Sequence, residues 1–148
     1  MANVFDVAKY ILTKTGTMTA MKLQKLVYYS QAWSLVWDDA PLFDNRIEAW
    51  ANGPVAPGLY HWHRGVFNVS ADKCAGDDSV LSAPQRDTVD AVLAHYADKS
   101  SQWLSDLTHA EDPWKNARQG LAPGERGNHE ITHTSMHEYY SRIASEQR

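Results

Sequence analysis

Three histidines spaced four residues apart form the most suggestive chemical pattern in the sequence. On one continuous α-helix, His129, His133 and His137 would stack on a single face, where imidazoles can together ligate a metal ion such as zinc. However, Gly127-Asn128 disfavours a helix at the start of this segment, and Ser135 has the chemistry of a helix N-cap. A helix that begins only near Ser135 would separate the three rings. We therefore expect no metal site, and a metal-dependent enzyme using these histidines is an alternative hypothesis.

The single cysteine, Cys74, lacks the surroundings of a catalytic thiol. It lies in a polar segment, residues 68–83, that we expect to be a surface loop tolerant of substitution. The chain also lacks the Gly-x-Ser-x-Gly, P-loop and dinucleotide-binding patterns of hydrolases and nucleotide-binding enzymes. One cysteine cannot form an intrachain disulfide or a cysteine-based zinc site. We therefore expect no catalytic residues and no cofactor.

The composition is that of an ordinary globular protein rich in aromatic residues. The 148 residues are 43% hydrophobic and 22% charged, which indicates one domain spanning residues 1–148. The six Trp and seven Tyr are typical of an aromatic core or of a surface that anchors a partner. A net charge of −4, without any block of five or more Lys or Arg, disfavours nucleic acid as a partner. The segment 1–6 does not resemble a signal peptide, so we expect a cytoplasmic protein.

The segment Met18–Trp37 is the element around which we expect the rest of the chain to pack. It contains no Pro or Gly, and Thr17 or Thr19 can cap a helix there. Its apolar residues fall on nearly all sides of that helix, so several neighbours must cover it. Polar residues such as Lys22 and Lys25 interrupt the run. The pattern therefore favours a buried helix of a globular protein over a membrane span, and we expect no membrane partner.

The remaining patterns predict shorter helices and a small sheet. Capping residues and apolar spacing place helices at residues 3–15, 57–64 and 84–97, and from Ser100 or Ser101, Asp112 and Ser135 onward. The helix after Ser100 or Ser101 is expected to bury Trp103, Leu104 and Leu107. A strand at 46–50 is expected to pair with residues 130–133. The expected fold class is mostly α (α+β): a compact helical domain around a central buried helix, with a small two-stranded antiparallel sheet.

Two blocks of sequence resemble a known protein family. The first is Lys22-Leu-Gln-Lys-Leu-Val-Tyr-Tyr-Ser-Gln-Ala-Trp33. The second is Ile47-Glu-Ala-Trp-Ala-Asn-Gly-Pro-Val55, and Pro41-Leu-Phe43 lies between them. In this order they resemble the Panacea antitoxin domain, whose members are also described as SocA-like or phage-associated GepA-like proteins.

This resemblance covers most of the chain and implies a function. It implies an antitoxin of a bacterial or phage toxin–antitoxin pair, which neutralises its cognate toxin by direct protein–protein binding. Many toxins of the family inhibit translation, and relatives of small alarmone synthetases are an example. The SocA-like description leaves a second interpretation open, in which the chain is a protease adaptor or a phage-associated interaction protein.

The resemblance and the residue types together indicate candidate site residues. Lys22, Lys25, Tyr29 and Trp50 are expected to be exposed and to bind the partner, although both lysines are equally compatible with a solvated helix end. The motif residues expected to be structural are Leu23, Gln24, Leu26, Tyr28, Trp33, Glu48, Gly53, Pro54 and Tyr60.

Overall fold

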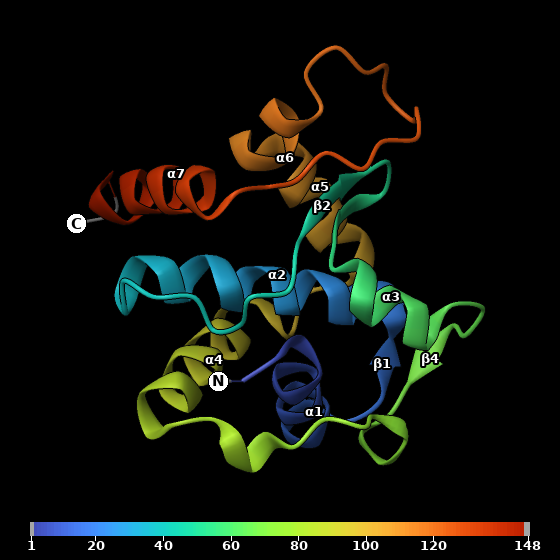
Figure 1. Cartoon of the computed structure of the whole chain (residues 1–148), viewed down its shortest axis with the longest axis vertical. Coiled ribbons are helices and arrows are strands. Elements are labelled where there is room, and N and C mark those ends of the chain that lie inside the picture. The colour runs from blue at the N-terminus through green and yellow to red at the C-terminus, as the bar shows by residue number, and fades with distance from the viewer. Residues whose placement is uncertain (1, 147–148) are drawn as a thin grey trace.

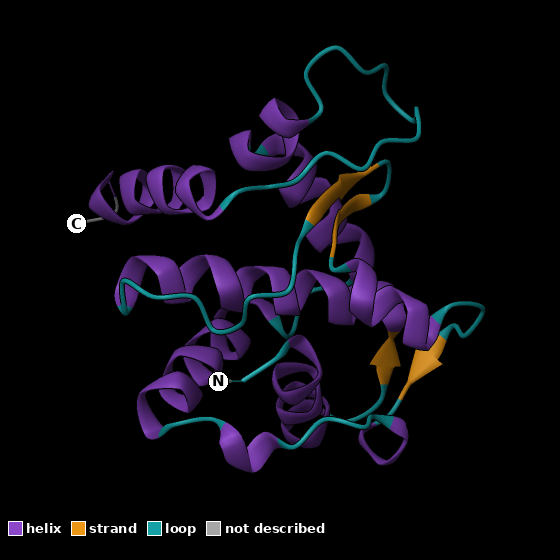
Figure 2. Ribbon diagram, in the orientation of Figure 1, coloured by secondary structure: helices purple, strands orange, loops and turns teal. Residues whose placement is uncertain are grey.

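The helix α2 (Ala20–Trp37) lies at the centre of the computed structural model, which describes residues 2–146 (Figure 1). The other helices are α1 (Val4–Thr15), α3 (Pro57–His63), α4 (Ala83–Tyr96), α5 (Ser101–Ala110), α6 (Asp112–Ala117) and α7 (His133–Glu146). The strands are β1 (Met18–Thr19), β2 (Glu48–Trp50), β3 (Gly53–Val55) and β4 (Asn68–Val69), and two 3₁₀ helices are η1 (Ala71–Lys73) and η2 (Asp78–Val80). Figure 2 shows how helices dominate the architecture, which confirms the mostly α fold class.

Neighbours cover α2 on several sides, as its apolar pattern predicts. The Thr19 side chain caps the helix by accepting a hydrogen bond from the Lys22 N–H at 3.1 Å. Helices α1 and α4 pack along one side, and α7 packs along the opposite side (Figure 1). As a result, most of α2 from Ala20 to Leu35 is buried, including several polar side chains. Across residues 2–146, every helix is too short or too polar to span a lipid bilayer.

The helices flanking α2 begin and end where their capping residues predict. Asn3 and Asp6 form a reciprocal capping box at the start of α1, and Gly16 ends that helix with a φ of 87°. Ser82 and Gln85 form the same arrangement at the start of α4. These local signals confirm both predicted helices.

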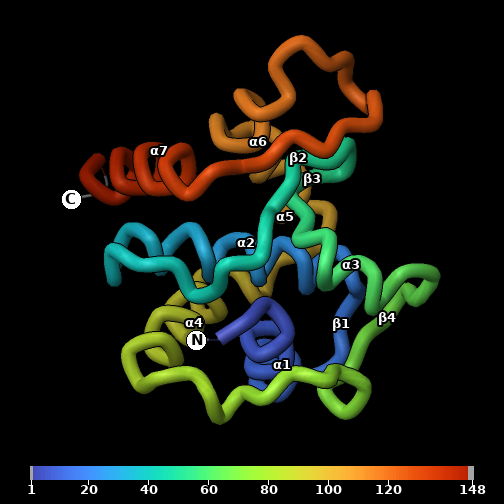
Figure 3. The backbone as a smooth tube through the Cα atoms, viewed as in Figure 1, coloured from blue at the N-terminus to red at the C-terminus, as the bar shows by residue number. Residues whose placement is uncertain are grey.

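Strand β2 pairs mainly with β3 rather than with the expected residues 130–133. The turn at Asn52-Gly53, where Gly53 has a φ of 124°, folds the chain directly back onto β2 in antiparallel register. Residues 130–133 contribute only one bridge, Glu48 to Glu130, along the other edge of β2. The expected pairing is therefore confirmed as a short antiparallel contact, in which the Ile131 N–H donates to the Ile47 carbonyl at 2.8 Å, but not as a strand. Figure 3 traces residues 121–132 as they run back past this hairpin toward α7.

A second small sheet, formed by β1 and β4, has no counterpart in the sequence analysis. Met18 pairs with Val69 and Thr19 with Asn68 in antiparallel register. Strands of two residues are too short to show an alternating pattern. The pairing fixes the segment before β4 beside the start of α2.

The segment 68–83 is not the tolerant surface loop that its polar composition suggests. Cys74 and Leu81 are buried, so the expectation of a surface cysteine is wrong. A Cβ added at Gly76 would clash with the backbone carbonyl of Phe5 in α1. The segment therefore packs closely against α1, a contact that a local pattern cannot reveal.

Two expectations for the later helices need correction. Helix α7 begins at His133 rather than near Ser135, and the Thr132 side chain accepts a hydrogen bond from the Ser135 N–H at 3.1 Å. In α5, Leu104 is buried as expected and Leu107 is half-buried, but Trp103 is 44% exposed. The reason is that α5 turns its Leu104 side toward α2, which leaves Trp103 near solvent.

Replacing Trp33 by alanine should lower the free energy of unfolding by about 3–5 kcal/mol, as for other buried aromatic truncations. Trp33 is 7% exposed, and its indole N–H donates to the Tyr96 hydroxyl at 3.1 Å. Urea denaturation followed by circular dichroism measures the change. Trp103→Ala is the matched control, because the exposed Trp103 should contribute much less. Equal losses in the two variants would contradict the placement of Trp33 in the core.

Candidate functional site

Two glutamines on α2 hold neighbouring backbone segments against the helix. The Gln24 carbonyl oxygen accepts from the Ala56 N–H at 2.9 Å, and its amide donates to the Ala56 carbonyl at 3.3 Å. In the same way, Gln31 accepts from the Leu42 N–H at 2.8 Å and donates to the Phe43 carbonyl at 2.8 Å. Both glutamines are buried and fully engaged. They fix the start of α3 and the loop after α2, which supports the structural role expected for Gln24.

A buried carboxylate joins α2 to α7. Glu111, between α5 and α6, accepts hydrogen bonds from the hydroxyl groups of Tyr29 at 2.6 Å and Tyr140 at 2.8 Å. The Tyr28 hydroxyl lies 3.0 Å from that of Tyr140. Burial raises the pKa of the Glu111 carboxyl above its usual value, while the two tyrosine donors act in the opposite direction. Glu111 is not among the residues expected from the sequence, because no local signal marks a carboxylate whose partners are distant in the chain.

Two of the four expected partner-binding residues have structural contacts inside the fold. The expected exposure of Tyr29 is wrong, because its ring is completely buried and its hydroxyl is bonded to Glu111. Lys22 is half-buried, and its ammonium donates to the Ala97 carbonyl at the end of α4 at 2.6 Å.

Trp50 lies at the surface in a half-buried position. Its indole N–H donates to the Glu48 carboxylate at 2.8 Å, and its ring meets that of Tyr60 edge-on at 4.8 Å between centroids. Among the motif residues expected to be structural, Glu48 and Tyr60 are half-buried. The rest are buried: Leu23, Gln24, Leu26, Tyr28, Trp33, Gly53 and Pro54.

Lys25 is the polar residue of α2 that the fold leaves without a partner. Its side chain is 1% exposed, contrary to expectation, yet its ammonium makes no hydrogen bond or ion pair with any residue in the described part of the chain. Burial lowers its pKa from 10.5 to about 8, because the charged form loses hydration. Gly53 makes room for it, since a Cβ at Gly53 would lie 2.6 Å from the Lys25 Cε.

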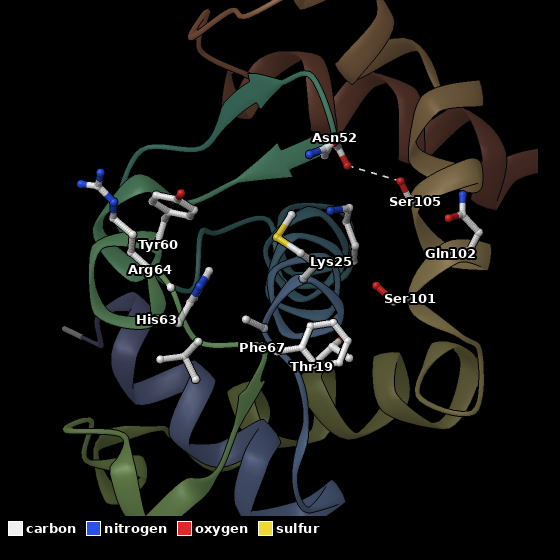
Figure 4. Close-up of a pocket in the computed structure, with 14 residues that line it drawn as sticks. Thr19, Lys25, Asn52, Tyr60, His63, Arg64, Phe67, Ser101, Gln102 and Ser105 are labelled. Carbon is white, nitrogen blue, oxygen red and sulfur yellow. Dashed lines mark hydrogen bonds between the residues drawn. The ribbon is translucent and has the colours of Figure 1, made fainter. Parts of the chain in front are cut away.

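A cavity of about 460 Å³ opens over Lys25; we call it the Lys25 cavity. It lies between the start of α2, the loop from α3 to β4, and α5. Its polar and charged lining residues are Thr19, Lys25, Asn52, Tyr60, His63, Arg64, Ser101, Gln102 and Ser105. None of the described lining residues carries a carboxylate. Figure 4 shows Lys25 extending from α2 toward Asn52 and Ser105.

A second concave surface, of about 740 Å³, lies between α2, α4, α5 and α7. We call it the aromatic groove, and its aromatic lining residues are Trp33, Trp37, His95, Tyr96, Trp103, Tyr139 and Tyr140. Trp37 and Trp103 are 49% and 44% exposed. Some of the many aromatic residues therefore form part of the core, and others are accessible at the surface.

The three histidines considered as metal ligands point to different partners. His129 lies before α7, with its Nδ1 2.8 Å from the Ala117 carbonyl. His133 and His137 share α7, but His133 faces Gln31 and His137 lies 3.6 Å from Asp39. In residues 2–146, no group of three or more His, Cys, Asp or Glu side chains is placed to hold a metal ion.

Replacing Lys25 by methionine should stabilise the protein at neutral pH. Methionine keeps the unbranched shape and removes the unpaired charge. The folded-state pKa lies below the unfolded one, so the unfolded chain binds more protons between about pH 8 and pH 10.5. The wild type therefore gains stability as pH rises through this window, and below it the ammonium costs about 3 kcal/mol. Chemical denaturation should show the advantage of Lys25→Met shrinking by this amount between neutral pH and about pH 10.5.

Lys22→Met is the control on the same helix. It removes a hydrogen bond to the Ala97 carbonyl, so it should lower stability. If the difference in the free energy of unfolding between Lys25→Met and wild type stays constant across the pH window, the Lys25 ammonium is well solvated and the prediction is wrong.

Comparison with known proteins identifies the family. A family model described as "Antitoxin SocA-like, Panacea domain" matches residues 23–115, from within α2 to within α6. Searches of curated proteins and of solved structures give no match. The matched segment contains Lys25, both glutamines of α2 and Glu111. Since the match covers more than half of the chain and confirms the resemblance seen in the motifs, this chain belongs to the SocA-like Panacea antitoxin family.

Proposed function

We propose that the chain is the antitoxin of a bacterial or phage toxin–antitoxin pair and that it neutralises its toxin by direct binding. The observation that carries this proposal is the match to the antitoxin family over residues 23–115. The match includes the polar side chains of α2 that organise the fold. In this mechanism the chain covers the toxin's active site or holds the toxin inactive, and it performs no catalysis of its own.

The fold suits inhibition by occupancy. Gln24, Gln31 and Glu111 tie α2 to the segments around it, so the surfaces that these segments form are fixed before a partner arrives. A preorganised surface loses little conformational entropy on binding. The aromatic groove and the Lys25 cavity supply two concave regions with exposed aromatic residues at their edges.

Silencing a toxin requires tight binding. Nanomolar affinity corresponds to about −12 kcal/mol, which an interface of standard size reaches with a few well-placed anchors. Trp37, Phe67 and Trp103 are exposed aromatic side chains that can act as such anchors. Lys25 and Trp50 stay in our proposal as partner-binding residues, whereas Lys22 and Tyr29 act by holding the scaffold.

The finer features of the proposal come from the family resemblance. We propose that residues 1–148 act as one antitoxin domain and that the toxin inhibits translation, as relatives of small alarmone synthetases do. Such a toxin acts in the cytoplasm, so its antitoxin must be present there too. A phage origin for the pair is compatible with the same resemblance.

Co-expression with the protein encoded beside this chain tests the function. If that protein is toxic, expression of the antitoxin should restore growth, and the two proteins should co-purify as a stable complex on gel filtration. The expectation follows from inhibition by occupancy, which requires a stoichiometric complex. If the toxin stays toxic in the presence of excess antitoxin and no complex forms, the proposal is wrong.

The same experiment separates the protease-adaptor alternative. An occupancy inhibitor restores growth without changing the amount of toxin, including in host cells that lack their ATP-dependent proteases. An adaptor instead lowers the amount of toxin and loses its effect in those cells. Metal analysis of the purified chain, with His133→Ala as the comparison, tests the metalloenzyme alternative.

A further inference from the structure

We propose that the Lys25 cavity receives a carboxylate side chain, aspartate or glutamate, from the toxin. This inference rests on the proposed function and identifies the chemistry of its contact surface. Three observations carry it: a Lys25 side chain that is 1% exposed and forms no hydrogen bond or ion pair with the described residues, a polar lining without a carboxylate, and exposed apolar side chains beside the cavity.

The buried position of Lys25 costs the folded state stability, and a negatively charged ligand would offset that cost. Lysine side chains normally extend along apolar surface until the ammonium reaches water. Lys25 instead ends inside the protein between Gly53 and α5, where nothing in residues 2–146 neutralises it. An unpaired charge in such a site destabilises the folded state, and an opposite charge from a partner removes that penalty. The cavity beside Lys25 thus provides space for an anion that would pair with its ammonium.

The lining of the cavity is suited to an anion. Ser101, Asn52 and Tyr60 place hydroxyl and amide groups, which can donate to an anion, around the space above Lys25. The Gln102 amide already donates to the Asp106 carboxylate at 2.8 Å, and Arg64 is exposed. The Ser105 hydroxyl already donates to the Asn52 carbonyl at 3.3 Å (Figure 4).

The position of the cavity along α2 adds to this preference. Thr19, Ala20 and Met21, at the start of α2, line the same space, and the start of a helix carries partial positive charge. With no carboxylate among the described lining residues, the local field favours negative charge.

The rim of the cavity indicates that the ligand belongs to a protein. Val66 and Phe67 line the cavity from the loop before β4 and are 51% and 77% exposed. The Phe67 carbonyl accepts a hydrogen bond from the Ala20 N–H at 2.8 Å, so the backbone of this loop is fixed while the phenyl ring faces solvent. Large apolar side chains exposed beside a cavity are typical of a surface that binds another protein.

Charge balance favours a carboxylate over a phosphate. Lys25 is the buried cation of the lining, because Arg64 is exposed to solvent. One carboxylate neutralises that single charge, whereas a phosphate dianion would leave excess negative charge inside the protein. The aromatic groove offers no comparable signal, because its buried charged group, Glu111, already accepts two tyrosine hydroxyl groups.

The decisive measurement is the affinity of the adjacent gene's toxin for matched variants, by isothermal titration calorimetry. Lys25→Met should weaken binding by at least about 30-fold, as when one partner of a buried charge pair is removed. Phe67→Ala should weaken binding as well. Lys22→Met, which does not touch the cavity, should bind as the wild type does. Circular dichroism of each variant confirms that it is folded.

The pH dependence of binding supplies a second readout. Only the protonated form of Lys25 pairs with a carboxylate, so wild-type affinity should fall as pH rises above about 8, while that of Lys25→Met should stay flat. Tyr60, His63 and Arg64 line the cavity, and the Asp106 carboxylate accepts a hydrogen bond from the lining residue Gln102. All four groups are unchanged in the variant. The difference between the two profiles therefore reports on Lys25 alone.

The free chain gives a test that needs no toxin. At constant ionic strength set with chloride, acetate should raise the melting temperature of the wild type and not that of Lys25→Met. Equal effects on both proteins would overturn the role of Lys25, and a larger effect of inorganic phosphate than of acetate would overturn the choice of a carboxylate.

The outcomes separate this inference from the proposed function. If the wild type neutralises the toxin and Lys25→Met binds it equally well, the inference fails and the antitoxin function stands. Loss of affinity in Trp103→Ala alone would place the contact at the aromatic groove instead. If the wild type binds no toxin, the proposed function fails, and the acetate experiment still decides whether the cavity binds an anion.

Discussion

The need to satisfy polar groups on a helix that is buried on nearly every side governs this structure. Water cannot reach the middle of α2, so its glutamines and tyrosines must find partners within the protein. Gln24 bonds to the backbone before α3, Gln31 to the loop after α2, and Tyr29 to Glu111. The bonds of Gln24 and Tyr29 link α2 to segments that are distant in sequence, and those of Gln31 hold the loop that follows the helix. The polar residues of the most buried helix are thus the ones that set the arrangement of its neighbours.

Lys25 differs from these residues although it lies on the same helix. The glutamines carry both donors and acceptors and can replace the hydrogen bonds of a backbone segment, whereas an ammonium needs acceptors or a negative charge. The hydroxyl and amide groups around Lys25 carry no negative charge, and Gly53 lets the lysine side chain approach closely without neutralising it. One helix thus carries both hydrogen-bonded amides and a cation that no described residue pairs with.

The sequence predicts those parts of the fold that depend on local signals. Capping residues such as Asn3 and Ser82 mark helix starts because their hydrogen bonds close within one turn. The pairing of β1 with β4 and the packing of Gly76 on α1 depend instead on contacts between distant segments, which no short window contains. For the same reason the expected exposure of Lys25 is wrong, and Glu111 gave no signal at all.

The placement of α7 over α2 has a consequence for synthesis of the chain. Met136 and Tyr140 of α7 are completely buried and belong to the same core as α2, yet α3 to α6 must be translated before α7 is made. On the ribosome, α2 therefore emerges long before its last cover does, and its aromatic residues stay open to chaperones and proteases during that interval. The core is therefore completed late, and fragments released before α7 is made lack the cover that α7 provides.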